Sequence, residues 1–232
     1  MKELVDILIV ALAAVTSASL QLGAGTLLML YHEGLGRKVP KRVRRITWGY
    51  IFGMLLFSIL IVAATILIML IVAGGPLDVD GQILLVSLAI AMSIIVIFLY
   101  YRHGKNTILW VPDWIAKYLR KRAGRADTAA EGIALGMTTA LGELLFSLPL
   151  IMIAANSLLN LPRVVIILAI AGYALIAIMP LLIMKMVIRS GRNLVDIQRW
   201  RVKNKTFFRV FIGICYLVIA VFLVAFKLMK GL

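Results

Sequence analysis

Long runs of apolar residues, separated by short polar connections, make up most of the chain. The hydrocarbon core of a bilayer is about 30 Å thick, so a transmembrane helix needs about 20 mostly apolar residues. Runs of about this length extend approximately over 4–31, 46–73, 83–101, 129–157, 163–188 and 207–228. The pattern predicts an all-α integral membrane protein with six transmembrane helices.

Composition supports this fold class. Hydrophobic residues make up 63% of the 232 residues, and the mean hydropathy is +1.05. A soluble core could not hold so many apolar side chains. Because little sequence remains outside the apolar runs, we expect a single transmembrane domain that spans residues 1–232.

The positive charge of the chain is concentrated in three connections. The formal net charge is +15, and the Lys and Arg residues gather in 37–45, 102–125 and 189–209, after the first, third and fifth predicted helices. The other connections contain Asp78 and Asp80 or are nearly neutral. Because cytoplasmic loops collect Lys and Arg, we predict a plasma-membrane protein with these loops inside and both termini outside. Topology therefore accounts for the charge, and a nucleic-acid partner is not expected.

Two of the basic connections contain amphipathic segments. The stretch WVPDWIAKYLRKR, 110–122, places apolar and aromatic residues on one side of a helix and basic residues largely on the other, and 194–202 repeats this pattern more weakly around Trp200. This is typical of short helices that lie in the headgroup region. We expect interfacial anchors that contact anionic lipids at the cytoplasmic face. A regulatory or partner-docking helix is the alternative.

A weak internal symmetry relates the two halves of the chain. A shift of about 122 residues aligns TSASLQLGAGTLLML with TTALGELLFSLPLIM, so that Gln21 faces Glu143 and Ser17 faces Thr139. With three helices in each half, the first and fourth helices cross the membrane in opposite directions. We expect two inverted three-helix repeats, about 1–102 and about 129–232, joined by an interfacial linker, about 103–128. Transporters built in this way place their site near the midplane, at the repeat interface.

Glu143 is a carboxylate in the middle of an apolar run. Thr128 and Glu131 predict a capping box at the start of the 129–157 helix, and about 14 residues at about 1.5 Å each place Glu143 roughly 20 Å beyond it. From this depth the carboxylate cannot reach the headgroups. A charge there costs several kcal/mol unless it is paired, solvated in a cavity or protonated. Glu143 should therefore face the bundle interior, either as a protonated packing residue or in a site for a substrate, ion or proton.

Further polar residues in the predicted helices complete the candidate site: Gln21, Ser17, Thr139 and Asn156. Gly and Pro residues around Glu143 and in the paired segment weaken their helices, which would free backbone groups to line a cavity. Tyr173, next to Gly172, is expected to point into the same interior. The hydroxyl of Ser58 has no special weight, because such groups commonly bond to their own helix.

The segments LGAGTLLML and ALGELLFSLPL, each in the first helix of a predicted half, carry a resemblance to a known family. Six helices in two inverted halves, each beginning with a polar segment broken by Gly or Pro, resemble the LysE exporter superfamily and the related CcdA/DsbD transmembrane domain. The CcdA/DsbD branch relays electrons through a cysteine in its first helix and another in its fourth. This chain contains a single cysteine, Cys215 in the sixth helix, so the thiol relay is excluded. The resemblance then implies efflux of a small solute or ion.

The sequence argues against an enzyme. The histidines are His32 and His103, both at predicted inner helix ends, and HEGLG lacks the second His that a zinc site on a helix needs. Ser147 lies in the outer half, away from both histidines, so a Ser–His dyad is not expected. Glycine-rich phosphate loops and dinucleotide fingerprints are absent. We expect no catalytic residue, no metal and no cofactor.

Together these patterns predict a small secondary transporter or exporter of a small solute or ion. Protonation of Glu143 would couple the movement of a proton or cation to that of the solute. The alternative is a non-transporting membrane subunit or assembly factor, in which Glu143 serves helix packing and the basic cytoplasmic surface docks a partner. In either case the protein could form a homo-oligomer or join a partner subunit.

Overall fold

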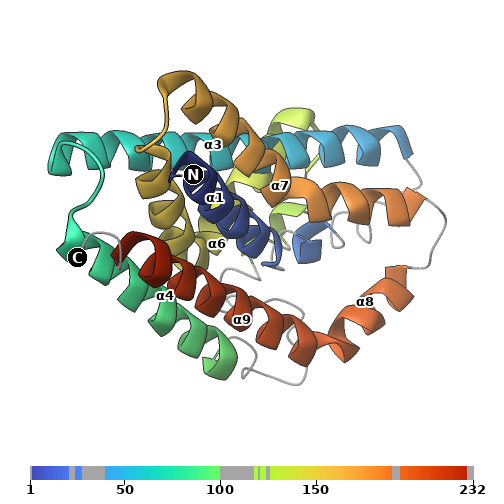
Figure 1. Ribbon diagram of the computed structural model, residues 1–232. Helices are drawn as coiled ribbons and strands as arrows, with labels where there is room; N and C mark the ends of the chain where they lie inside the picture. The colour runs from blue at the N-terminus through green and yellow to red at the C-terminus, as the bar shows by residue number, and fades with distance from the viewer. Residues whose placement is uncertain are drawn as a thin grey trace.

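The computed structural model describes residues 2–20, 24–27, 40–99, 118–119, 121–123, 126–189 and 194–228. Within them all regular structure is helical (Figure 1). The helices are α1 (Lys2–Ala18), α3 (Pro40–Ala73), α4 (Val79–Leu99), α6 (Ala129–Leu158), α7 (Arg163–Arg189), α8 (Leu194–Lys203) and α9 (Lys205–Leu223), and α9 continues into a π-helical turn, η1 (Val224–Leu228). Figure 1 shows α4 and α9 side by side, with α3 on the other side of the bundle.

Five helices in the described part of the chain are long and apolar enough to cross a membrane. The segments are Arg42–Ala73, Val79–Phe98, Ala129–Leu158, Arg163–Arg189 and Thr206–Phe226. Large apolar side chains cover their outer surfaces: Val72 is 80% exposed, Leu145 74% and Ile167 71%. A water-facing surface seldom carries apolar side chains this densely, whereas the hydrocarbon core accommodates them. The prediction of an all-α multi-pass membrane protein is confirmed at this level.

The first predicted run, 4–31, is not one continuous helix. α1 ends at Ala18, and residues 24–27 are helical again. The hydroxyl of Ser19 donates to the carbonyl of Thr16, and the amide of Leu20 donates to the carbonyl of Ser17, so the chain tightens into a turn at this end. With 17 residues, α1 is shorter than the five spanning helices. Gln21 lies outside the described residues.

The short segments between the long helices are described in part. Residues 194–202, predicted as an amphipathic helix, lie in α8, so the helix is confirmed. At its end Trp200 contacts Phe208 of α9 edge to face, with 5.7 Å between the ring centroids. Of the predicted helix 110–122, only 118–119 and 121–122 are described, and they are helical.

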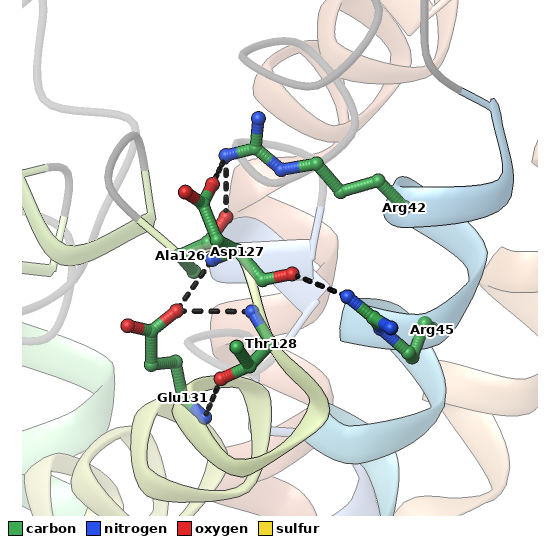
Figure 2. Close-up of polar contacts among 6 residues, drawn as sticks. All are labelled: Arg42, Arg45, Ala126, Asp127, Thr128 and Glu131. Carbon is green, nitrogen blue, oxygen red and sulfur yellow. Dashed lines mark hydrogen bonds and ion pairs between the residues drawn. The ribbon is translucent and has the colours of Figure 1, made fainter.

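The start of α6 is capped as predicted and is tied to the start of α3. Thr128 and Glu131 form the capping box, in which the Thr128 hydroxyl accepts from the Glu131 amide and the Glu131 carboxylate accepts from the Thr128 amide (Figure 2). Arg42 pairs with the Asp127 carboxylate and also donates to the Ala126 carbonyl at 2.9 Å. Arg45 donates to the Asp127 carbonyl at 3.0 Å. These contacts fix where α6 begins relative to α3, and therefore how far along the helix from α3's start Glu143 lies.

The helices α3 and α6 cross through four glycines. Gly49 and Gly53 are one turn apart on α3, and Gly132 and Gly136 are one turn apart on α6. A Cβ on any of the four would overlap the backbone of the facing helix. Gly53 faces the Ile133 carbonyl, and Gly136 faces the Tyr50 carbonyl. Such small-residue contacts let backbones approach closely in a membrane, where no hydrophobic effect drives helices together.

Side-chain hydrogen bonds connect the remaining helices. Ser93 of α4 donates to the Gly213 carbonyl of α9 at 2.8 Å, within the buried face that these two helices share. Tyr216 of α9 donates to the Phe146 carbonyl of α6. In hydrocarbon each of these polar groups needs an internal partner, so the bonds also fix how the helices are rotated against one another.

Candidate functional site

The cavity that contains Glu143 lies where α1, α3, α6 and α7 meet. Glu143 is near the middle of α6, a 30-residue helix, and its side chain is half-buried. The cavity volume is about 30 Å³. Its lining comprises Ser17 of α1, Met54, Phe57, Ser58 and Ile61 of α3, Ala140, Glu143, Ser147 and Ile151 of α6, and Tyr173, Ala177 and Ile178 of α7.

Helical spacing explains the contribution of α6. Residues 140, 143, 147 and 151 recur every three or four positions, so they share one face of that helix. Ser147 therefore lies one turn beyond Glu143 on the same side. A carboxylate and a hydroxyl from α6 thus face Ser17, Ser58 and Tyr173 across the cavity.

Tyr173 has an unusual hydroxyl. The side chain is 2% exposed, and its hydroxyl oxygen has no hydrogen-bond partner among the described residues. The Ser17 hydroxyl is its neighbour, outside good hydrogen-bonding geometry. Leaving a buried hydroxyl unpaired costs about 1 to 3 kcal/mol in an apolar interior. Tyr173 lines the cavity, so a ligand or a water there could satisfy its hydroxyl.

Ser58 can act toward the cavity as a hydrogen-bond acceptor, because its donor is already engaged. Its hydroxyl donates to the Met54 carbonyl one turn back at 2.9 Å. The hydrogen is therefore used within α3, and the oxygen lone pairs remain for the cavity. Among the described residues that line the cavity, Glu143 has a charged side chain and Tyr173 is the other titratable group.

The structure brings together two of the predicted site residues, Glu143 and Ser17. Thr139 is buried in α6 and donates to its own helix at the Leu135 carbonyl, outside the cavity lining. Asn156 lies 13 residues beyond Glu143, roughly 20 Å along the helix. Its side-chain oxygen accepts from the Leu77 amide at 2.8 Å, which holds the α3–α4 connection against the end of α6.

Ser58 and Ser147 also line the cavity, although the sequence did not single them out for the site. The position of Ser147, four residues after Glu143, is a pattern that could have found it, since i and i+4 share a helix face. Nothing in the sequence of α3 distinguishes Ser58 from Thr65, which donates to its own helix in the same way.

A second, larger cavity lies on the opposite face of α6. Its volume is about 540 Å³, and the lining is Tyr118, Lys121, Arg122, Ala126, Glu131, Ala134, Leu135 and Thr138. On α6 these residues recur at 131, 134, 135 and 138, about half a helical turn away from the face that carries Glu143. The two cavities are therefore separated by the body of α6.

A cationic group lies near the other end of α7. The Lys185 ammonium sits over the ring of Trp48 of α3, 2.8 Å from its centroid, with Arg44 and Arg189 nearby. Trp48 is 54% exposed on the outer surface. Tryptophan beside basic residues is typical of the interface between hydrocarbon and headgroups.

Comparison with known proteins yields no relative for this chain: no protein-family model, no curated protein and no solved structure matches it.

Proposed function

We propose that the protein is a small secondary transporter whose site is the cavity at Glu143, where protonation of the carboxylate is coupled to movement of a small solute or ion. The observation that carries this proposal is the cavity itself. One carboxylate and several hydroxyls line it, near the middle of α6 and among four helices. Ionisable residues at this depth are costly, and where they occur they commonly belong to ion or proton pathways.

The helix pairs support the two inverted halves that this function needs. In the predicted repeats α1 corresponds to α6, α3 to α7 and α4 to α9. Each of these helices packs against its counterpart. The other main contacts also match between the halves. When each helix is replaced by its counterpart, the α1–α7 contact corresponds to the α3–α6 contact, and the α1–α9 contact corresponds to the α4–α6 contact. A two-fold arrangement would produce this pattern, and it would place the cavity at the interface of the repeats.

Breaks in the helices around the cavity would let it open. Pro149 interrupts the hydrogen bonding of α6 just beyond Ser147, and Pro180 does the same in α7 beyond Ala177. Alternating access in such folds is largely rocking of one repeat against the other around a fixed site. We propose that α6 and α7 bend at these prolines while the glycine contact between α3 and α6 holds.

The test is proton movement in proteoliposomes that contain a pH-sensitive dye. Gradients of small cations and of small organic solutes are imposed in turn, and a coupled solute should drive a pH change inside the vesicles. Glu143→Gln keeps the shape and polarity of the side chain but removes its proton, so it should abolish the response.

Glu131→Gln is the matched control. It makes the same chemical change on the same helix, and Gln also serves in a capping box. This variant should respond like the wild type. A Glu143→Gln variant that moves protons as the wild type does, or a wild type silent to every gradient, would contradict the proposal and favour a non-transporting membrane subunit.

A further inference from the structure

Three basic side chains gather where the start of α3 meets the end of α7. These two helices pack against each other and run in opposite directions, so the two ends lie at the same end of the bundle (Figure 1). Arg44 and Trp48 are one turn apart on α3. Lys185 and Arg189 are one turn apart on α7. The Lys185 ammonium lies over the Trp48 ring, and both arginines are near enough to repel its charge.

The positive charges of this cluster lack acidic partners in the described part of the chain. The Nζ atom of Lys185 is buried and has no hydrogen-bond acceptor there. Arg44 and Arg189 form no ion pair among the described residues, whereas Arg42, on another face of α3, does. The ring face of Trp48 attracts the ammonium but does not replace the oxygen acceptors that its three N–H groups need. An anion among the three side chains would supply them and reduce the repulsion.

The position of the cluster favours an occupant that comes from the membrane. Both helices belong to segments long and apolar enough to span it, and Arg44 and Arg189 lie at the ends of these segments. Trp48 is 54% exposed on the outer surface, and Phe52, one turn further into α3, is 53% exposed. Tryptophan beside basic residues marks the boundary between hydrocarbon and headgroups. A lipid at this boundary contacts both the charges and the apolar surface.

The placement of Lys185 differs from that of a lysine that only extends toward water. Such a lysine buries its stem and leaves the ammonium in water or among the headgroups. Here the ammonium itself is buried against Trp48, four residues or about 6 Å deeper along α7 than Arg189. A lipid phosphate can approach to this depth, whereas a soluble protein partner would first have to displace lipid.

The chemistry of the cluster selects among phospholipids. A phosphate offers oxygen acceptors to an ammonium and can pair with a guanidinium through two hydrogen bonds. A zwitterionic phospholipid also carries an ammonium group, which three basic side chains repel. A phospholipid with net negative charge avoids this repulsion, and basic surfaces between transmembrane helices commonly bind such headgroups.

We propose that the start of α3 and the end of α7 together bind one anionic phospholipid, whose phosphate lies among Arg44, Lys185 and Arg189 and whose acyl chains lie along Trp48 and Phe52. The lipid would bridge the two helices at this end of the bundle. The proposal concerns a surface separate from the Glu143 cavity, and it does not depend on the transporter function.

Quenching of Trp48 fluorescence by brominated lipids tests this binding in the full chain. The other three tryptophans are first replaced by phenylalanine: Trp110, Trp114 and Trp200. The protein is placed in phosphatidylcholine nanodiscs that contain an increasing fraction of brominated phosphatidylglycerol or, separately, brominated phosphatidylcholine. Brominated phosphatidylglycerol should reach half-maximal quenching at a mole fraction lower by about fivefold or more, because basic residues near the surface attract anionic lipid.

Variants identify the charges that bind the lipid. Lys185→Met removes the charge but keeps an unbranched side chain against Trp48, so it should reduce the preference for phosphatidylglycerol about fivefold. Arg189→Gln should have a similar effect, and its exposed position leaves the packing unchanged. Lys203→Met is the matched control for Lys185→Met, because it removes the same charge from an exposed position in α8. It should keep the preference of the parent.

Quenching by brominated phosphatidylcholine reports whether each variant keeps the surroundings of Trp48. If Lys185→Met alters this quenching, Arg189→Gln decides the question. Equal quenching by the two lipids in the parent protein would contradict the proposal. So would an equal loss of preference in Lys185→Met and Lys203→Met, which would show that only the net charge attracts the lipid. Displacement of brominated phosphatidylglycerol by inorganic phosphate would assign the site to a soluble anion instead.

Discussion

At the scale of single residues, Tyr173 and Tyr216 show two uses of a buried phenol in one bundle. Tyr173 is 2% exposed and Tyr216 is 0% exposed. The Tyr216 hydroxyl donates to the Phe146 carbonyl and joins α9 to α6, next to the turn that carries Ser147. The Tyr173 hydroxyl has no such partner among the described residues and faces the cavity. One hydroxyl serves the fold, and we assign the other to the ligand.

Replacing each tyrosine by phenylalanine should separate these roles in stability. Tyr216→Phe removes a buried hydrogen bond that joins α9 to α6, so it should lower the free energy of unfolding by about 1 to 2 kcal/mol. Tyr173→Phe removes a hydroxyl that has no hydrogen-bond partner among the described residues, so it should be neutral or slightly stabilising. Reversible unfolding in mixed micelles measures both variants. A larger loss for Tyr173→Phe than for Tyr216→Phe would contradict the assignment.

The sequence located Glu143 correctly near mid-helix because burial depth follows from counting residues after a capping box, and the structure confirms that box. It also named Ser17 as part of the same candidate site, and Ser17 lines the cavity with Glu143. Asn156 shows the limit of this reasoning. A side-chain amide in an apolar run can bind a ligand or can satisfy an otherwise unpaired backbone group. Here the side-chain oxygen of Asn156 accepts from the backbone amide of Leu77. Polarity in a membrane helix predicts that a partner exists, but it does not identify the partner.

At the scale of elements, the contact between α3 and α6 depends on its four glycines. Each lies against backbone atoms of the other helix, so no side chain can rotate away to make room. Gly172 of α7 is different, because a Cβ there would meet nothing within 4 Å. The two situations offer a direct comparison of packing with helix propensity.

Gly53→Ala should therefore weaken the α3–α6 contact, whereas Gly172→Ala should not. The added methyl at position 53 overlaps the Ile133 carbonyl, and overpacking of this kind costs about 1 to 3 kcal/mol. At position 172 the same change should be neutral or stabilise by up to about 1 kcal/mol, because Ala favours helix over Gly. The same unfolding assay provides the comparison. Equal effects of the two substitutions would show that the glycines are not packing residues.

The apolar runs predicted the long helices well, since α3, α4, α6, α7 and α9 each coincide with one run. The run 4–31 was less informative. Hydropathy does not register the hydrogen bonds of Ser19 and Leu20 that close α1, because both residues fit within an apolar average. The contact between the glycine pairs of α3 and α6 could not be predicted either, because the spacing of glycines within one helix does not identify the helix that packs against them.

At the scale of the whole molecule, several basic residues from different helices lie together at one end of the bundle. Arg42 and Arg45 at the start of α3 contact the start of α6, and Lys185 near the end of α7 contacts Trp48 of α3. Asp78 and Asp80 lie in and after the α3–α4 connection, which is held at the far end of α6 through Leu77 and Asn156. The fold thus brings Arg42, Arg45 and Lys185 together at one end, a clustering of basic residues that is typical of the cytoplasmic side of membrane proteins.

The basic end should face the cytoplasm, and impermeant thiol labelling of intact cells checks this. The background is Cys215→Ala, which removes the single cysteine. Asp80 and Lys121 are both exposed and lie at opposite ends of the bundle. A cysteine at either position is therefore accessible to a reagent on its own side. Asp80→Cys should be labelled in intact cells, and Lys121→Cys only after permeabilisation, which is also the control that both thiols react. Labelling of Lys121→Cys but not Asp80→Cys in intact cells would reverse the orientation.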